Sequence, residues 1–521
     1  MRSTSRIGAV ARALAALAAV VAPAAAELTP EWSVRLPVGS ALTAGLAGLV
    51  VDAAGVSYLT GITGSSSNTD IVTAAYGPNG GLLWSHVYNG PENWHDQARW
   101  ITLGPGVVVY VTGNTPGPGR YANVLLLKYD AVTGALLNTV RYSSGPFTAE
   151  HGAAVVTDAN GAVYVAGGTV GDGGDVLVLK FDAAGQFLWQ KVWDGPAAAP
   201  YSQDTVADIA LDRDGNPVVL IHGVMNTLHP DYVVVKYAGG DGAVLWEAVW
   251  GVRGGDFPTD FELDAAGDFY LTGTGIDFID RYSTVKLGGT DGRLLWQHYD
   301  SIGQRDTAAA VALDNAGGVY ITGSSDPDGN LSNFNNNFYT VKRDASGGAL
   351  LWTHFYGQDC VGCHDAPGDV LVDSAGHVLV VGQTSSPPYS SDMILFVLHA
   401  QTGAEVDRGV IFSTVPETVS GGVLRFDAAE NLYVGGGYYN ANTGAKDIAL
   451  FKFAALARTP GDLSCDGVVN FDDINPFVLA LSDPAGYQAQ FPNCNILNGD
   501  INGDGFVNFD DINPFVALLA R

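Results

Sequence analysis

Hydrophobic and polar positions along this chain recur in units of about 54 residues. Each unit opens with an apolar segment that runs into an Asp-x-x-Gly turn and then into a Val-Tyr-Val-x-Gly segment. A variable loop, a Val-x-Lys-Tyr/Phe-Asp segment and a Gly-x-Leu-Leu-Trp segment complete the unit. Six of the turns begin at Asp52, Asp158, Asp212, Asp264, Asp314 and Asp373. Leu103–Gly106 replaces this turn in the second unit and Asp427–Glu430 in the last, so we count eight units.

Each unit is predicted to form four β-strands, because glycine supplies the positive φ of a tight hairpin and the Val- and Tyr-rich segments favour strands. Six of the eight lysines occupy one repeat position in the third segment, and we expect their stems to pack beside the Trp strand: Lys128, Lys180, Lys236, Lys286, Lys342 and Lys452. The fourth segment carries Trp84, Trp189, Trp246, Trp296 and Trp352. Four-stranded units at a period of about 40 to 50 residues are typical of a β-propeller.

The chain also indicates how this propeller closes. The last unit, residues 418–457, has three predicted strands and lacks the Trp strand. Residues 31–36 resemble an isolated Trp strand, with Trp32 placed 52 residues before Trp84. Pairing that segment with the last unit removes two open sheet edges. We therefore predict an all-β, eight-bladed propeller closed by the N-terminal strand, with seven blades as the alternative.

Composition narrows the class of protein. The 521 residues include 67 Gly, are 47% hydrophobic and only 15% charged, which excludes a disordered chain. With 54 acidic and 25 basic residues the formal net charge is −29, which makes nucleic acid a poor partner. The same oxygen-rich composition suits calcium.

The N-terminus is typical of an export signal. Arg2, Arg6 and Arg12 flank or precede a short apolar run, and Ala24–Ala26 fits a cleavage site before Glu27. An uncleaved anchor is the alternative. We assign residues 1–26 to a signal peptide, 27–457 to the propeller and 458–521 to a separate module. No later segment is long and apolar enough to span a membrane, so we expect a secreted or cell-surface bacterial protein.

The repeat units resemble the bacterial β-propeller repeat called SBBP. The likeness is carried by segments such as Asp314–Ser324, Phe338–Lys342 and Gly348–Trp352, and it covers about 31–457. The resemblance implies the propeller fold, and it implies no activity.

One repeat position is acidic in six units, eight residues before the turn: Asp96, Glu150, Asp204, Asp256, Asp306 and Asp365. Because the first strand of a blade lines the central channel, these side chains are candidates for an acidic ring at the channel mouth. Such a ring would bind a cation. The alternative is that each carboxylate caps backbone N–H groups at the entry to its own strand.

Cys360, Cys363 and His364 form a Cys-x-x-Cys-His string, the pattern of covalent haem c attachment. His364-Asp365 aligns with His95-Asp96 of an earlier unit, so the histidine also has a repeat-level explanation. We favour a local disulfide between the two cysteines over haem or another metal.

Two near-identical segments follow residue 457. Each contains a twelve-residue loop with oxygen donors at the positions that bind calcium in EF-hand loops and glycine at position 6. The predicted ligands are Asp462, Ser464, Asp466, Val468 (carbonyl), Asn470 and Asp473 in loop one, and Asp500, Asn502, Asp504, Phe506 (carbonyl), Asn508 and Asp511 in loop two. An apolar stripe at helical spacing follows each loop. Asp473 and Asp511 are the expected N-caps of these helices.

This duplicated loop–helix pattern resembles a type I dockerin over 461–521. The resemblance implies two bound calcium ions and calcium-dependent docking onto a cohesin-like module or cell-surface component. It also implies recognition residues at loop positions 10 and 11, which here are Phe471, Asp472, Phe509 and Asp510. Their identity in both halves allows two binding orientations. Cys465 and Cys494 are expected to form a disulfide within this small module.

Three functions are compatible with these features. The first is a non-catalytic propeller that binds a glycan or protein and is attached through its calcium-dependent module. The second is a polysaccharide-degrading hydrolase or lyase, for which no catalytic residue stands out among 54 acids. The third is a quinoprotein-like dehydrogenase, because Asp130–Gly134 and the Leu-Leu-Trp strands resemble quinoprotein repeats. We favour the first.

Overall fold

The fold is seen in a computed structural model of the chain. It describes residues 28–39, 45–65, 67–145, 148–170, 174–195, 204–224, 230–251, 255–277, 279–301, 303, 305–314, 316–327, 336–357, 364–386, 390–411, 417–440, 444–456, 459–491, 494, 496–502 and 507–520. Within these residues no helix has the length and apolar character needed to cross a membrane.

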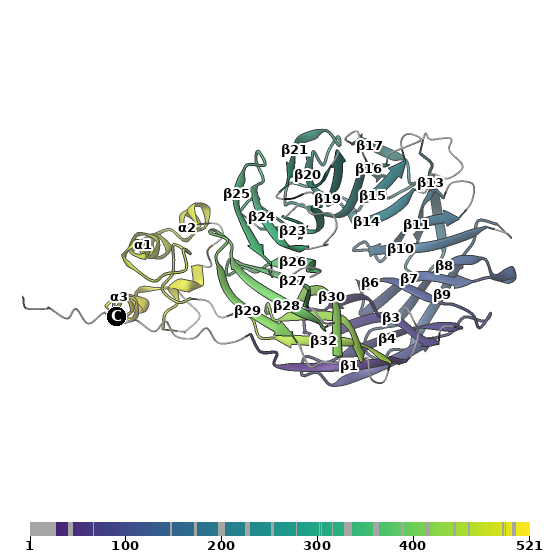
Figure 1. The fold of residues 1–521 in the computed structure, drawn as a ribbon, viewed down its shortest axis with the longest axis horizontal. Helices are drawn as coiled ribbons and strands as arrows, with labels where there is room; N and C mark the ends of the chain where they lie inside the picture. The colour runs from purple at the N-terminus through teal and green to yellow at the C-terminus, as the bar shows by residue number, and fades with distance from the viewer. Residues whose placement is uncertain are drawn as a thin grey trace, which may run out of the picture.

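Eight four-stranded blades surround a central axis (Figure 1). Blade one contains β2 (Leu46–Val51), β3 (Ser57–Ser65), β4 (Asn68–Tyr76) and β5 (Leu82–Tyr88). Blade two contains β6 (Gln97–Gly104), β7 (Val108–Pro116), β8 (Ala122–Asp130) and β9 (Leu136–Tyr142), with the 3₁₀ turn η1 (Pro118–Arg120) between β7 and β8. Blade three contains β10 (Ala149–Thr157), β11 (Val163–Val170), β12 (Val176–Phe181) and β13 (Phe187–Trp193). Blade four contains β14 (Thr205–Leu211), β15 (Pro217–Val224), β16 (Pro230–Tyr237) and β17 (Val244–Trp250).

The second half of the circle repeats this arrangement. Blade five contains β18 (Asp256–Leu263), β19 (Phe269–Asp277), β20 (Ile279–Leu287) and β21 (Leu294–Asp300). Blade six contains β22 (Thr307–Leu313), β23 (Gly318–Ser325), β24 (Asn337–Asp344) and β25 (Leu350–Tyr356). Blade seven contains β26 (Ala366–Val372), β27 (His377–Ser386), β28 (Ser390–His399) and β29 (Glu405–Ile411). Blade eight contains β30 (Glu417–Phe426), β31 (Leu432–Asn440), β32 (Ala445–Phe453) and the N-terminal strand β1 (Trp32–Gly39).

The predicted closure is confirmed. β1 pairs antiparallel with β32 and so supplies the fourth strand of blade eight, with Trp32 opposite Lys452 and Leu36 opposite Ile448. A short parallel contact between Gly39 and Gly64 joins this blade to blade one. The count is therefore eight blades, and the seven-bladed alternative is excluded.

The repeated lysines and tryptophans connect each blade to the next. In blade six, Lys342 Nζ and Trp352 Nε1 both donate to the carbonyl oxygen of Ala400 in blade seven, at 2.9 and 2.8 Å. The lysine Nζ also lies 5.0 Å from the ring centroid of Tyr320 on the second strand of its own blade. The equivalent lysines Lys128, Lys180, Lys236, Lys286 and Lys452 donate to carbonyls in the same way. In the pairing register Lys342 lies opposite Trp352 and Lys180 opposite Trp189, so these lysines lie beside the Trp strand as expected.

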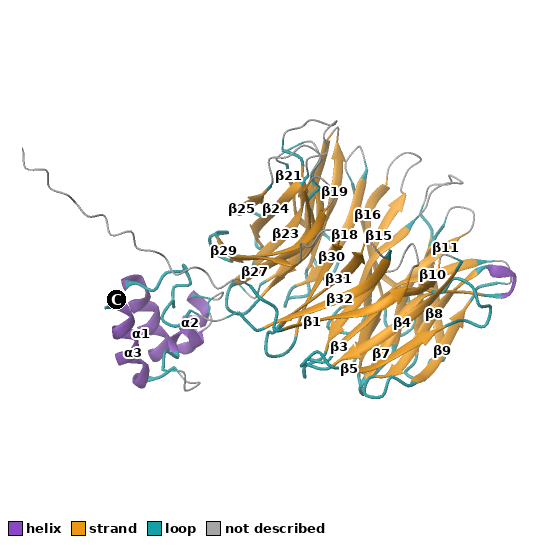
Figure 2. Cartoon of the chain, turned by 60° about the horizontal axis from the view of Figure 1, so that its bottom comes forward, coloured by secondary structure: helices purple, strands orange, loops and turns teal. Residues whose placement is uncertain are grey.

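Short helices form the C-terminal module (Figure 2). Its elements are η2 (Phe471–Asp473), α1 (Ile474–Ser482), α2 (Pro484–Gln490), η3 (Ile496–Gly499), η4 (Phe509–Asp511) and α3 (Ile512–Leu519). Phe477 and Phe515 meet in its core with ring centroids 4.3 Å apart, beside Leu463 and Tyr487. The predicted Cys465–Cys494 disulfide is present and lies in this core.

The expected helix caps need correction. Asp473 and Asp511 make no side-chain cap to α1 and α3. Asn470 and Asn508 cap the preceding 3₁₀ turns instead, accepting from the backbone N–H groups of Asp472 and Asp510, both at 2.7 Å. The aspartates complete reciprocal capping boxes by accepting from the backbone of those asparagines. The helical turn therefore begins one turn earlier than the apolar stripe indicates.

Candidate functional site

Carboxylates at the two ends of loop one accept hydrogen bonds from its backbone. Asp462 is 3% exposed, and its carboxylate accepts from the backbone N–H groups of Asp466 at 3.2 Å and Gly467 at 3.0 Å. Asp473 accepts from the backbone of Ser464 and Asn470, both at 2.8 Å. These bonds fold the loop back over its first and last predicted ligands.

Like charges gather in this loop. Burial raises the pKa of Asp462, and the negative charges of Asp473 and Asp466 raise it further. A cation bound among these carboxylates would stabilise them, because it would offset their repulsion. The oxygen donors present, three carboxylates with the Ser464 hydroxyl and the Asn470 amide, fit a hard ion such as calcium.

Loop two repeats this geometry where it is described. Asp511 is fully buried, and it accepts from the backbone N–H groups of Ile501 at 2.8 Å, Asn502 at 3.0 Å and Asn508 at 2.9 Å. Asp500 is also buried. Asp504 and the Phe506 carbonyl lie outside the described residues. The calcium assignment of both loops stays a prediction.

The four predicted recognition residues lie on the surface of the module. Phe471 is 74% exposed and Phe509 is 76% exposed, and Asp472 and Asp510 beside them are exposed as well. Val478 on α1 and Val516 on α3, at matching positions of the two halves, are also exposed, at 55% and 57%. Two chemically matched apolar faces therefore stand on the two halves of the module.

The six acidic side chains expected at the channel mouth are all buried: Asp96, Glu150, Asp204, Asp256, Asp306 and Asp365. Most of their described contacts are local. Asp204 accepts from the backbone of Gly195 at 3.2 Å and Val224 at 2.7 Å, and Asp96 accepts from Gly90 at 2.6 Å. These contacts agree with the capping alternative, in which each carboxylate fixes the loop that enters its own blade.

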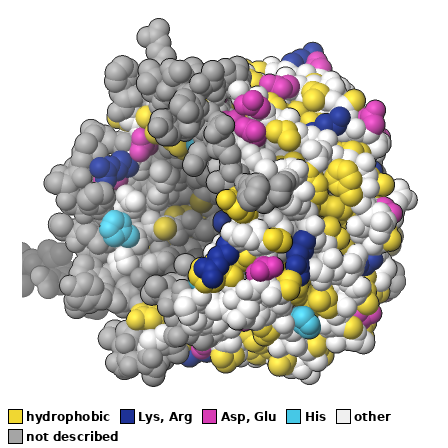
Figure 3. All heavy atoms as spheres, turned by 90° about the vertical axis from the view of Figure 1, so that its right-hand side faces the viewer, with side chains coloured by type: hydrophobic (Ala, Val, Ile, Leu, Met, Phe, Trp, Pro, Cys, Tyr) yellow, Lys and Arg dark blue, Asp and Glu magenta, His cyan; other side chains and the backbone are white. Residues whose placement is uncertain are grey.

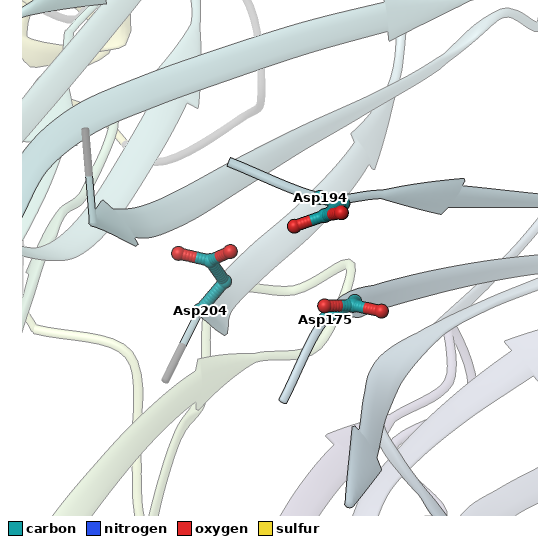
Figure 4. A group of neighbouring side chains, drawn as sticks. All are labelled: Asp175, Asp194 and Asp204. Carbon is teal, nitrogen blue, oxygen red and sulfur yellow. The ribbon is translucent and has the colours of Figure 1, made fainter. Parts of the chain in front are cut away.

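One member of this set belongs to a compact acidic group. Carboxylate oxygens of Asp175, Asp194 and Asp204 lie within 4.8 Å of one another at the junction of blades three and four (Figure 4). Burial raises the pKa of Asp175, and the charges of Asp194 and Asp204 add to the effect. Among the described residues this is the group of three acidic, His or Cys side chains close enough to share one ion.

A second acidic set faces the channel itself, and sequence reasoning missed it. Asp208 on β14, Asp260 and Glu262 on β18, and Asp369 on β26 line a central cavity of about 490 Å³ together with Arg425 on β30. Trp100 and Phe261 contribute aromatic surface to the same cavity. We call the five charged residues the axial cluster. Three of its carboxylates stand four residues after Asp204, Asp256 and Asp365, so the repeat period carried a signal for them.

Burial and the crowding of like charges raise the pKa values of the carboxyls in the axial cluster. Burial and the charges of Asp260 and Glu262 raise the pKa of Asp208 to about 8. Burial and Asp260 raise the pKa of Glu262 to about 8, and burial with Asp369 raises the pKa of Asp260 to about 7. Burial also raises the pKa of Asp369, although Arg425 Nη1 lies 3.2 Å from its carboxylate. Groups with such values exchange protons near neutral pH.

The Cys-x-x-Cys-His string is only partly described. Cys360 and Cys363 lie outside the described residues, so neither the disulfide nor haem attachment is tested. His364 is exposed, and its backbone N–H and carbonyl both bond to the Ser385 hydroxyl, at 2.8 and 2.9 Å. Its main chain is therefore hydrogen-bonded to β27 of blade seven.

The outer surface is mixed in character. On the side of the molecule shown in Figure 3, apolar, acidic and basic side chains are interspersed over the part not drawn in grey. Exposed apolar residues at the start of the fourth strands include Leu188, which is 50% exposed.

No family model and no curated protein sequence matches the chain. Among solved structures, the quinohemoprotein alcohol dehydrogenase of Comamonas testosteroni aligns over 83% of this chain and 77% of its own, with 13% identity and a TM-score of 0.50. Sqt1 from Chaetomium thermophilum aligns over 81% of this chain and 100% of its own, with 11% identity and a TM-score of 0.49. At 13% identity the likeness to the dehydrogenase concerns the fold alone and leaves the activity open.

Proposed function

We propose that this protein is an exported, non-catalytic β-propeller that binds a glycan or protein and is attached to a cohesin-like or cell-surface partner through its calcium-dependent C-terminal module. The observation that carries the proposal is the pair of matched exposed faces, Phe471 with Val478 and Phe509 with Val516. A water-exposed phenylalanine costs solvation free energy that a partner surface recovers.

The placement of these faces supports calcium dependence. Each exposed phenylalanine directly follows a capping asparagine and precedes the buried aspartate that closes its loop, Asp473 or Asp511. A cation held by the loop would fix the turn that presents the phenylalanine. Removing the cation would therefore weaken binding through loss of order in the presenting turn.

The axial cavity supports a ligand role for the propeller. Its carboxylates and Arg425 offer acceptors and donors for hydroxyl groups, and Trp100 offers an aromatic surface for an apolar sugar face. A glycan array probed with the chain lacking residues 1–26 tests this part. Binding that is lost in Trp100→Ala but kept in Trp94→Ala would support the cavity as the ligand site.

Calcium binding is tested by titration calorimetry on the same chain after removal of divalent ions. We expect binding of two calcium ions, and loss of one site in each of Asp473→Asn and Asp511→Asn. Asp483→Asn is the matched control, because Asp483 lies outside both loops and caps α2 by accepting from Gly486 at 3.0 Å. Absence of calcium binding by the unmodified chain would overturn the assignment.

Docking is tested on a panel of immobilised type I cohesin modules with and without chelator. The double variant Phe471→Ala/Phe509→Ala should lose binding, whereas either single variant should keep it through the other face. Val410→Ala, which alters an exposed apolar residue of blade seven, is the control. Chelator-resistant binding, or binding by the double variant, would contradict the docking mechanism; binding to no panel member would contradict the cohesin partner alone.

One observation favours the polysaccharide-degrading alternative. Carboxyls whose pKa lies near 7 or 8, such as Asp260 and Glu262, are suited to general acid–base catalysis. Release of reducing or unsaturated ends from a panel of polysaccharides, abolished in Glu262→Gln, would replace the non-catalytic proposal with this one.

A further inference from the structure

First strands of adjacent blades belong to separate sheets, yet the axial cluster bonds them to one another. Asp260 on β18 accepts from the backbone N–H of Val311 on β22 at 2.8 Å. Glu262 accepts from Leu313 on the same strand at 3.3 Å. Blades five and six are therefore joined beside the channel by two side-chain acceptors.

The same bridge joins blades seven and eight. Asp369 on β26 accepts from the backbone N–H of Leu424 on β30 at 2.9 Å. The guanidinium of Arg425 forms an ion pair with the same carboxylate at 3.2 Å. Each of these aspartates also binds the next N–H of its own strand, at 2.9 Å in both Asp260 and Asp369. The carboxyl group thus holds two strands at once.

A β-bulge aims these side chains at the axis. The pairing register shifts between Val206 and Asp208, between Pro258 and Asp260, and between Pro367 and Asp369. Every other first strand has a bulge at the same repeat position, but the residues that follow are Gly48, Trp100, Ala154, Ala310 and Val423. Bulges commonly redirect a side chain in this way. Carboxyls at this position are therefore confined to blades four, five and seven. Those of blades five and seven bridge to the next blade, whereas Asp208 accepts from Ile209 of its own strand at 2.7 Å.

Charge in this arc is unbalanced when every carboxyl is ionised. Asp208, Asp260, Glu262 and Asp369 face Arg425, and among the described residues that line the cavity no further side chain is charged. A protonated carboxyl still accepts strongly through its carbonyl oxygen and weakly through its hydroxyl oxygen, so protons remove the repulsion and keep the bridge made by the carbonyl oxygen in place.

We propose that the axial cluster is a proton-operated clasp. Within the arc of blades four to eight, it holds blade five to blade six and blade seven to blade eight when its carboxyls carry protons, and it loosens these joints when the carboxyls are ionised. The clasp goes beyond the proposed docking and ligand binding, and it would set how easily the channel wall opens. Raising the pH loosens the clasp, because ionisation places up to four negative charges opposite the single guanidinium of Arg425.

Hydrogen–deuterium exchange measures the clasp directly on the chain lacking residues 1–26. The neutral variant Asp208→Asn/Glu262→Gln keeps the acceptors for Ile209 and Leu313 and cannot ionise at either position. Peptides covering β18, β22 and β26 are compared between variant and unmodified chain at pH 5.5 and pH 8.5, so that the intrinsic exchange rate cancels.

We expect equal protection at pH 5.5 and at least about tenfold stronger protection in the variant at pH 8.5, since one pKa unit corresponds to a tenfold change. Asp291→Asn removes one acidic charge from an exposed turn of blade five and should match the unmodified chain at both values. Equal protection of the neutral variant and the unmodified chain at pH 8.5, or an equal difference at both pH values, would overturn the proposal. A variant less protected at both values would show that the carboxylates stabilise the arc as ions, which also overturns it.

Discussion

The indole N–H of Trp32 donates to the carbonyl oxygen of Pro78 at 2.9 Å, although 46 residues separate them. Lys452 Nζ reaches the same oxygen at 3.3 Å from β32. This joint repeats the Trp–Lys–carbonyl contact between other blades, with the tryptophan supplied by the opposite end of the chain. The same type of contact therefore joins the last blade to the first and joins other neighbouring blades.

Removing the Trp32 contact should weaken the attachment of β1 to blade eight. Trp32→Ala deletes the indole hydrogen bond and its packing against Tyr433, whose ring centroid lies 6.0 Å away. We expect a loss of about 2–4 kcal/mol in the free energy of unfolding, since the site is partly buried. Chemical denaturation gives the loss, and hydrogen exchange locates it.

Trp84→Ala is the matched comparison, because Trp84 donates to Ala131 at 2.8 Å within a continuous stretch of chain. Exchange should rise in β1 and β32 for Trp32→Ala, and around blades one and two for Trp84→Ala. A uniform rise in both variants would contradict a local closure joint.

Lys342→Met should weaken the joint between blades six and seven. It removes the 2.9 Å bond to Ala400 and the cation above Tyr320, and it leaves the buried Asp314 carboxylate without the lysine 3.8 Å away. We expect a loss of about 1–3 kcal/mol, moderated because Trp352 still donates to Ala400. Lys128→Met, at a more exposed copy of the position, should cost less in the same denaturation assay; the reverse order would contradict the role of burial.

Removing the disulfide should lower the thermal stability of the module more than that of the propeller. Cys465 and Cys494 enclose a separation of 29 residues, and a loop of that size corresponds to about 3–4 kcal/mol in the chain-entropy description. For Cys465→Ser/Cys494→Ser we expect a lower thermal midpoint for the module and an unchanged midpoint for the propeller in calorimetry. A shift of the propeller midpoint instead would contradict the assignment of this bond to the module.

Thermal stability should fall as pH rises from about 5 to about 8. The folded-state pKa of Asp208 and Glu262 is about 8 and that of Asp260 about 7, whereas the unfolded chain has values near 4. Between these limits the folded chain binds more protons than the unfolded chain, so the free energy of unfolding decreases with rising pH. Melting curves of the unmodified chain across this window check the sign, and a midpoint that rises with pH would contradict it.

The repeat itself predicted most of the fold. Asp-x-x-Gly turns, Val-Tyr-Val segments and Leu-Leu-Trp strands are local signals, because turn geometry and strand propensity depend on residues close in sequence. The missing fourth strand of the last unit and the isolated Trp32 segment then required the closure that β1 and β32 make. Nearness of Cys465 and Cys494 in a small module likewise predicted their bond.

The functional surfaces were harder to predict from the sequence. The dockerin resemblance implied that Phe471 and Phe509 are recognition residues, and the structure places both on the surface. Sequence spacing did not indicate whether Asp204 and its equivalents bind the neighbouring backbone or a shared ion, since that depends on where Gly195 and Val224 lie in three dimensions.

By itself the sequence determined the four-stranded repeat unit, its strand order, the closure and the loop–helix duplication, because each follows from patterns in short segments. The structure then decided for eight blades over seven. Tertiary structure alone decided which acids meet. Asp208, Asp260 and Asp369 come from three different blades, and a backbone bulge in each first strand precedes them on the channel wall. Their shared cavity and raised pKa values arise from that convergence, which no local pattern encodes.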